Sequence, residues 1–367
     1  MAGIIAPRRG GGPAGTVAGV ATSAAKAGGA LQALAAAALF GASAPLAKLL
    51  VPTVDPVTLA GLLYLGAGLA LVMRRGRVET PLTWNDAPVM AGVVVAGGML
   101  GPWLLLVGLR HVSAVTVSLL LNLEAPFTIL LATTLFGEHL GPRAMSGAAA
   151  IVAGAVLAGG RGEPGFSDLL GGAAVVGACA SWALDTNLSQ RLSGRDPIAI
   201  VRVKGLTAGT AMLLVARLGG APPPSLAATG AGLLLGAGAY GASLVLTMRA
   251  LRVLGGARQA AYFATAPFLG AALAVPLLGE RVDTTIALAA ATMAAGIALL
   301  LDERHTHLHT HEPLTHDHAH AHDEHHRHAH DGPFTEPHAH PHRHLPLTHD
   351  HAHVSDAHHR HPHRRAR

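Results

Sequence analysis

Five ionisable residues interrupt long apolar stretches of the chain: Lys48, Glu124, Asp185, Arg202 and Lys204. A charge at the centre of a bilayer costs about 2.5–3.5 kcal/mol on the insertion scale unless it faces a partner or a cavity. Two carboxylates and three cations therefore predict pairing inside the protein. We expect Glu124 and Asp185 to line a central cavity and to bind a substrate cation or a coupling proton. Lys204 or Lys48 would balance their charge.

Asn122 and Asn187 are the polar neighbours that we assign to the same candidate site. Alternatives stay open for the cations. Lys48 ends the first apolar stretch, where its ammonium could instead extend outward to the membrane interface. Arg202 and Lys204 follow a predicted cytoplasmic loop, where basic residues also serve to fix orientation in the membrane.

Pro126 and Pro267 stand near the middle of two apolar stretches, and each removes a backbone hydrogen bond there. Such breaks mark the binding region of many inverted-repeat carriers, so both are candidate hinges. The alternative is a packing kink. Trp103 and Trp182 are expected to be packing residues.

The composition predicts an all-α membrane protein. Charged residues make up 13% of the chain, against about 25% in soluble domains, and half of the chain is apolar. Apolar stretches long enough to cross a bilayer recur ten times. The predicted spans are 28–50, 57–73, 87–108, 112–135, 144–160, 169–190, 198–218, 226–248, 256–278 and 283–301. Residues 1–27 are expected to be a disordered cytoplasmic leader.

Lys and Arg concentrate in the loops that are cytoplasmic if the N-terminus is cytoplasmic, which predicts an inner or plasma membrane protein with both termini inside. The net charge of +5 is explained in the same way, so no nucleic-acid partner is expected. The single Cys179 excludes an internal disulfide. No phosphate-binding loop ending in Gly-Lys occurs, so neither ATP hydrolysis nor another enzymatic activity is expected.

The body repeats itself at offsets of 141 or 142 residues. Leu109-Arg110 returns as Leu251-Arg252, Ala125-Pro126-Phe127 as Ala266-Pro267-Phe268, and Phe136-Gly137-Glu138 as Leu278-Gly279-Glu280. This predicts two halves of five helices, 28–160 and 161–301. Because five is odd, the second half enters the bilayer inverted, as in secondary transporters.

The repeated segments resemble a known family. Val107 to Leu157, with LRHVSAVTVSLLLNLEAPFTILLATTLFGEHL at its centre, is similar to an EamA domain of the drug/metabolite transporter superfamily. RALRVLGGARQAAYFATAPFLGAALAVPLLGERV, from Arg249 to Val282, is similar to a second copy. The resemblance implies ten helices and secondary transport of a small molecule, without naming the substrate. It departs at Glu124, where the second repeat has Thr265.

Residues 302–367 form a polar tail rich in histidine, which we expect to be disordered and cytoplasmic. The octapeptide that begins at Pro313 returns at Pro346, so the repetition is native. Imidazoles in alternation can gather around Zn, Ni, Co or Cu. The candidate ligands are His305, His307, His309, His311, His316, His318, His320, His322, His325, His326, His328, His330, His349, His351, His353, His358, His359, His361 and His363.

Three hypotheses follow. The first is a secondary carrier that exports a small metabolite, requires no cofactor and carries a metal-binding tail. The second is a carrier of Ni, Co or Zn whose tail collects or senses the metal. The third is a membrane-anchored metal buffer. Besides the substrate, the lipid bilayer and a divalent transition metal are expected partners, and the sequence leaves monomer and homodimer both open.

Overall fold

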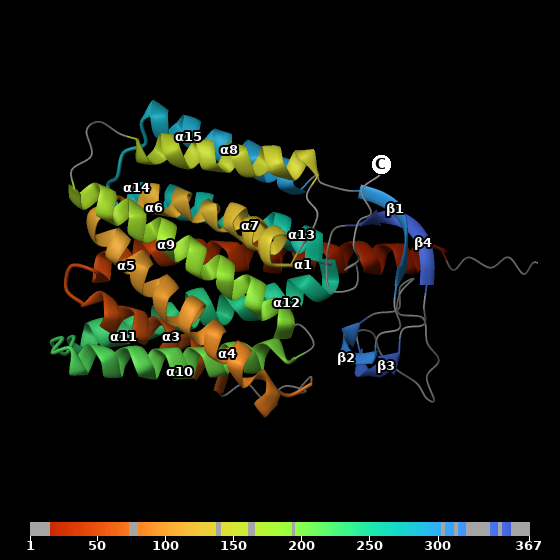
Figure 1. Cartoon of the computed structure of the whole chain (residues 1–367), viewed down its shortest axis with the longest axis horizontal. Helices are drawn as coiled ribbons and strands as arrows, with labels where there is room; N and C mark the ends of the chain where they lie inside the picture. Colours follow the sequence, from red (N-terminus) through yellow and green to blue (C-terminus); the bar gives the residue numbers. More distant parts are fainter. Residues whose placement is uncertain are drawn as a thin grey trace, which may run out of the picture.

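The computed structural model describes residues 15–72, 80–136, 141–160, 166–192, 195–254 and 256–301, together with four short segments of the tail. Within these ranges, nine helices are long and apolar enough to cross a membrane, and the shorter apolar helix Pro56–Val72 adds a tenth segment. The expectation of an all-α membrane protein is therefore confirmed. The elements lie side by side as an elongated bundle (Figure 1).

The first half contains five helical segments, some of which are subdivided. Its elements are α1 (Gly15–Gly41), α2 (Ser43–Leu50), α3 (Pro56–Val72), η1 (Trp84–Asp86), α4 (Ala87–Val93), η2 (Val94–Leu100), α5 (Gly101–His111), α6 (Ala114–Leu120), η3 (Leu121–Leu123), α7 (Glu124–Phe136) and α8 (Pro142–Gly159).

The second half repeats this order. Its elements are α9 (Phe166–Ser189), η4 (Gln190–Leu192), α10 (Pro197–Leu218), α11 (Leu226–Gly236), η5 (Ala237–Ala242), α12 (Ser243–Leu254), α13 (Gly256–Phe263), α14 (Ala266–Leu278) and α15 (Thr284–Leu301).

Side chains in the connections set where several helices begin. The Asp55 carboxylate accepts hydrogen bonds from the backbone N–H groups of Val57 and Thr58 at 2.9 and 3.1 Å. Asp196 caps α10 in the same way. Each Asp precedes a proline, which suits the first helical turn because its missing N–H would have no partner there. The turn-forming sequences thus fix the helix ends.

Helix packing is symmetric under exchange of the two halves. The second segments α3 and α10 pack together, as do the last segments α8 and α15, and α6 packs on α14. The first segment of each half packs on the third segment of the other, α1 on α12 and α9 on α5. Corresponding positions of the two halves therefore meet around one centre.

Both halves depart from regular α-helix at matching places. η2 and η5 are π-helical turns in the third segment of each half, related by the offset of the sequence repeat. In the fourth segment, the 3₁₀ turn η3 precedes Pro126, and a turn at residues 264–265 precedes Pro267. π-turns and proline breaks widen or bend helices, so these four irregularities change the direction of the side chains near the centre.

Small residues let the last helices of the two halves approach closely. A methyl group added at Gly147 in α8 would lie 2.7 Å from the Gly296 carbonyl oxygen in α15, and one added at Gly296 would lie 2.7 Å from the Gly147 carbonyl oxygen. Neither backbone can move away without separating the two helices. Close approach of helix backbones at small residues is typical of packing between membrane helices.

We therefore expect Gly147→Ala to lower the free energy of unfolding by about 1–3 kcal/mol through overpacking. Thermal unfolding in detergent measures this. Gly159→Ala is the matched control on the same helix, because open space surrounds Gly159. Equal melting temperatures for the two variants would contradict close packing of α8 on α15.

The ends of the chain differ from the sequence expectation. Helix α1 already begins at Gly15, so residues 15–26, predicted to be disordered, continue the first span as helix. The reason is their composition, since Ala-rich sequence favours helix and the adjoining span removes the cost of nucleation.

The described parts of the tail are strands, whereas disorder was expected. β1 (His305–His311) pairs with β4 (Leu347–His353), and β2 (Thr315–His320) pairs with β3 (His338–Arg343), both antiparallel. Alternation of two residue types has the period of a strand, which is the physical basis for this difference. His322, His325, His326, His328, His330, His358, His359, His361 and His363 lie outside the described residues.

Candidate functional site

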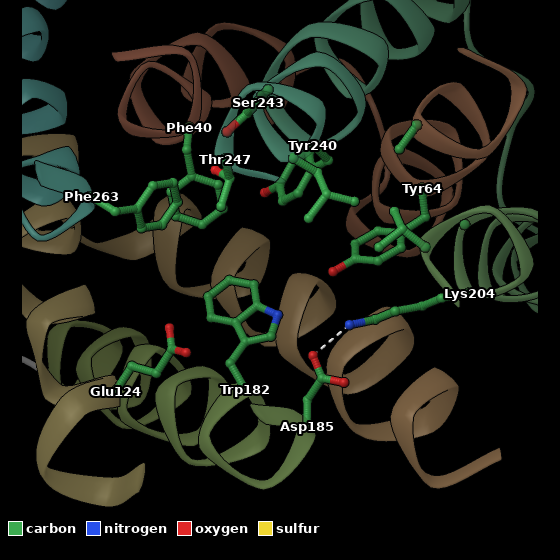
Figure 2. Close-up of a pocket in the computed structure, with 15 residues that line it drawn as sticks. Phe40, Tyr64, Glu124, Trp182, Asp185, Lys204, Tyr240, Ser243, Thr247 and Phe263 are labelled. Atoms are coloured by element: carbon green, nitrogen blue, oxygen red, sulfur yellow. Dashed lines mark hydrogen bonds and ion pairs between the residues drawn. The ribbon is translucent and has the colours of Figure 1, made fainter. Parts of the chain in front are cut away.

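A cavity of about 310 Å³ lies between the two halves (Figure 2). Its walls come from the first, second and fourth segments of the first half and from the first four segments of the second half. Its charged and polar lining residues are Glu124, Asp185, Lys204, Ser243 and Thr247, and its aromatic ones are Phe40, Tyr64, Trp182, Tyr240 and Phe263.

An ion pair forms one side of the cavity. Lys204 Nζ in α10 lies 2.5 Å from Asp185 Oδ2 in α9, and each side chain is only 13% exposed. The pair lies directly against Gly97 of η2, where an added methyl group would overlap both side chains. Glycine is therefore needed at this position for the pair to form.

Glu124 lies at the first position of α7, immediately after the turn η3. The only hydrogen bond to its carboxylate among the described residues comes from the Thr186 hydroxyl, at 3.3 Å. Figure 2 shows the Glu124 carboxylate and Asp185 on either side of Trp182. The cavity therefore holds one carboxylate that is paired with a cation and a second that is not.

Four aromatic rings make a continuous wall opposite the carboxylates. Neighbouring ring centroids are 5.5 Å apart for Tyr64 and Tyr240, 5.7 Å for Tyr240 and Phe40, and 5.3 Å for Phe40 and Phe263. These separations are within the range of favourable aromatic pairs. Aromatic residues are only 4% of the chain, so five of them around one small cavity is a marked concentration.

The carbonyl oxygen of Gly97 in the π-turn η2 orients the side chains of Tyr64 and Trp182. It accepts hydrogen bonds from the Tyr64 hydroxyl at 2.5 Å and from Trp182 Nε1 at 3.1 Å. Trp182 also fills the space left by Gly101, where an added methyl group would lie 2.6 Å from its indole nitrogen. Trp182 is therefore fixed at the cavity, beyond the packing role expected from the sequence.

Two polar atoms of the lining residues lack a hydrogen-bond partner in the described part of the chain. They are Asp185 Oδ1 and the Thr247 hydroxyl oxygen. Buried polar groups are normally hydrogen-bonded, and both of these belong to residues that face the cavity. They are available to a polar ligand.

The structure brings Glu124, Asp185 and Lys204 together, but it does not bring Lys48, Asn122 or Asn187 to the cavity. Lys48 Nζ donates hydrogen bonds to the carbonyl oxygens of Leu109 and Val112, the latter at 2.8 Å. The Lys48 charge is thus satisfied at the end of α5, and the expectation that it belongs to the central site is corrected.

The two asparagines hold helices together. Asn122 Nδ2 donates to the Leu119 carbonyl oxygen at 2.8 Å and contacts the Met293 sulfur in α15. Asn187 Nδ2 donates to the carbonyl oxygens of Ala183 and Thr128. Asn122 lies in the turn η3 and Asn187 joins α9 to α7, so both amides bond to backbone groups and neither lines the cavity.

A contact that the sequence did not identify joins the two halves at one end of the bundle. The Glu280 carboxylate, just after α14, accepts hydrogen bonds from the N–H groups of Ala114 and Val115 at the start of α6, both at 2.7 Å. Glu280 also interacts electrostatically with Lys48. The repeated Gly-Glu motif was the available signal, but its role depends on a partner in the other half.

At the other end, Arg195 pairs with Asp86 through two nitrogen–oxygen contacts of 3.0 and 3.2 Å. This pair links the connection after α9 to η1. Each end of the bundle therefore has its own polar contact between the halves.

A second cavity, of about 440 Å³, opens near the start of α6 and α9 and is lined by His111, Ser113, Thr116 and Asp168 among others. Its residues offer hydrogen-bonding groups. Among the described residues, no cluster of three or more His, Cys, Asp or Glu side chains could hold a metal ion. The described residues that line this cavity include no Phe, Tyr or Trp, in contrast to those of the first cavity.

Sequence reasoning found the charged side chains of the cavity and missed its aromatic and hydroxyl residues. Charges in apolar stretches stand out because burial is costly. Phe40, Tyr240 and Phe263 carry no such signal, since an aromatic residue in a span is usually a packing residue. The available signal was the repeat itself, which aligns Phe40 with Trp182 at an offset of 142 residues.

Comparison with known proteins agrees with this architecture. The EamA-like transporter family matches residues 27–160 and again 169–302. An uncharacterized transporter of Methanothermobacter thermautotrophicus is 30% identical over 296 residues, which cover 74% of this chain and 85% of that protein. A solved crystal structure, 21% identical, has the same fold with a TM-score of 0.53 and covers 76% of this chain and 96% of its own. The chain therefore belongs to the EamA-like transporter family, with one EamA domain in each half.

Proposed function

We propose that this transporter is a secondary active carrier that exports a small organic solute through the central cavity. The observation that carries the proposal is the cavity itself: buried charges, unpartnered polar atoms and aromatic rings meet at helix irregularities between two repeats. Central sites of this kind are expected in carriers that alternate access between inverted halves. The volume of about 310 Å³ is at the lower end of ligand cavities, which favours a small substrate.

The position of the lining residues supports loading from the cytoplasm. Val201 and Lys204 lie in the first two turns of α10, and Thr247 lies in the second turn of α12, within the C-terminal part of the segment 226–254. In the orientation predicted from the basic residues, both places are in the cytoplasmic half. The contact of Glu280 with α6 joins the two halves at the opposite end. A substrate taken up from the cytoplasm and released after reversal would be exported.

A transition-metal cargo is the less favoured alternative. Soft-metal pathways use His, Cys or Met as ligands, whereas the fifteen residues drawn around the cavity include none of these. Two carboxylates and an ammonium suit a solute that carries its own charge and polar groups.

The test uses full-length protein in proteoliposomes that contain a pool of bacterial metabolites. Efflux into the medium is followed by mass spectrometry. Val201→Trp fills the cavity, and Val203→Trp, exposed on the outer surface of the same helix, is the matched control. We expect the control but not the cavity variant to release specific solutes. Solute release that is equal in both variants would argue against transport through this cavity.

We also propose that the tail binds divalent transition metal. Its support is the alternating histidine sequence together with the register of the strands, which places histidine opposite histidine. The opposed pairs are His305 and His353, His307 and His351, His309 and His349, His316 and His342, His318 and His340, and His320 and His338. Directly opposed residues of an antiparallel ladder have Cα atoms about 4.5–5.5 Å apart, close enough for two residues to share one ion.

A chain that ends at Leu301 should lose most bound Zn²⁺ and Ni²⁺ while it keeps solute efflux, because the cavity lies wholly in the helical body. Equilibrium dialysis followed by elemental analysis gives the metal bound per chain, and the proteoliposome assay gives efflux. Equal metal content with and without residues 302–367 would contradict metal binding by the tail.

A further inference from the structure

The charges of the cavity specify the class of solute, an inference that rests on the proposed function. Asp185 and Lys204 neutralise each other at 2.5 Å. The Glu124 carboxylate, in contrast, has the Thr186 hydroxyl as its only described hydrogen-bond partner. Among the described residues that line the cavity, Lys204 is the only cation. These residues therefore provide one carboxyl group more than they provide cationic groups.

The aromatic wall is suited to a cation with an apolar body. A cation is attracted to the face of an aromatic ring within about 6 Å of its centroid. Lys204 Nζ already takes such a position, 6.0 Å from the centroid of Tyr64. Phe40, Tyr240 and Phe263 continue the wall away from Lys204. In Figure 2, Glu124 and Phe263 both lie at the left of the view, across the cavity from each other, and Lys204 lies at the right.

Two further atoms indicate a polar group on the ligand. Asp185 is 91% buried, since 9% of its surface is exposed, and its Oδ1 has no partner in the described residues. The Thr247 hydroxyl is also unpartnered and lies next to the aromatic wall. An N–H or O–H group of the ligand could donate hydrogen bonds to these oxygens. A ligand without such a group would leave them unpaired, and buried polar atoms left unpaired select strongly against it.

We propose that the substrate is a small organic cation, an alkyl or aryl amine whose ammonium binds at Glu124 and whose apolar body packs on Phe40, Tyr240 and Phe263. Asp185 and Lys204 stay paired and form the polar boundary of the site. An anionic solute would meet Glu124 unfavourably, because Lys204 is already neutralised by its partner.

Three probes of nearly equal size isolate the effect of charge: 2-phenylethylammonium, 2-phenylethanol and phenylacetate. Binding to the full chain in lipid nanodiscs is measured by calorimetry at pH 7. We expect the ammonium to bind at least tenfold more tightly than the alcohol, and the carboxylate not to bind. Glu124→Gln should weaken ammonium binding at least tenfold and Phe263→Leu severalfold. Asp168→Asn, a carboxylate of the second cavity, should leave it unchanged.

Failure of this inference is distinguishable from failure of the proposed function. Preference for phenylacetate, equal binding of all three probes, no binding of any, or an unchanged affinity in Glu124→Gln would each overturn the cation class. The Val201→Trp efflux experiment does not depend on substrate charge. If efflux is blocked there while the probes behave in one of these ways, the cavity remains the transport site and only the substrate class is wrong.

Discussion

Replacing Asp185 with Asn should abolish transport and lower the free energy of unfolding by about 3–5 kcal/mol, the cost of leaving one charge of a buried pair without its partner. The remaining ammonium of Lys204 would lie in a cavity walled by aromatic rings, with side-chain exposure of only 13% before the change. Lys204→Gln should be comparably costly, because it leaves Asp185 unpaired beside Gly97. Denaturant titration in detergent and the efflux assay measure the two effects.

The double variant Asp185→Asn/Lys204→Gln is the informative member of this set. Removing both charges removes the cost of the unpaired one, so the double variant should be more stable than either single variant. Transport should not recover, since the boundary of the site is changed. Arg195→Gln is the matched control at the end of the bundle, where the Asp86 pair is more exposed on the arginine side, at 27%, and its loss should cost about 1 kcal/mol or less.

A cost for Asp185→Asn no greater than that for Arg195→Gln would mean that water, not the partner, satisfies the central charges. Additivity of the two single variants would lead to the same conclusion. Either result would contradict a tightly paired boundary and would also weaken the inference that Glu124 is the free carboxylate of the cavity.

Replacing Glu280 with Ala should weaken the contact between the two halves at one end of the bundle and so increase access to the cavity from that end. The Glu280 carboxylate, in the second half, accepts two hydrogen bonds from backbone N–H groups of α6, in the first half, both at 2.7 Å. Hydrogen bonds to charged groups contribute about 1.5–3 kcal/mol each, and a shift of about 1.4 kcal/mol is tenfold in a conformational equilibrium. We therefore expect access to the cavity from that end to increase at least tenfold.

Access is measured with a cysteine placed at Thr247 in a Cys179→Ala background and a membrane-impermeant maleimide applied to right-side-out vesicles. Asp55→Ala is the matched control, because it also removes a carboxylate that accepts two backbone N–H groups, but within its own half. It should lower stability without changing the labelling rate. An unchanged labelling rate in Glu280→Ala would mean that Glu280 only caps α6 and does not control access to the cavity.

The sequence by itself determined the class and the plan of this protein. Apolar stretches of bilayer length admit only helices, because every backbone polar group in lipid must be satisfied within the segment. The repeated Leu-Arg, Ala-Pro-Phe and Gly-Glu motifs predicted two equivalent halves, and two EamA matches confirm the family. Glu124, Asp185 and Lys204 were identifiable because a charge in an apolar span is costly unless something compensates for it.

Only the tertiary structure decided which of these residues meet. Lys48, in the first half, is a lysine in an apolar stretch just as Lys204 is. Its ammonium nevertheless donates hydrogen bonds to the carbonyl oxygens of Leu109 and Val112, away from the cavity. Phe40, Tyr240 and Phe263 come from three segments. Tyr240 lies in the π-turn η5, and Phe263 lies just before the turn that precedes Pro267. Hydrophobic periodicity reports which residues are apolar, but the cavity depends on how helices of the two halves cross, which is a property of pairs of segments far apart in the chain.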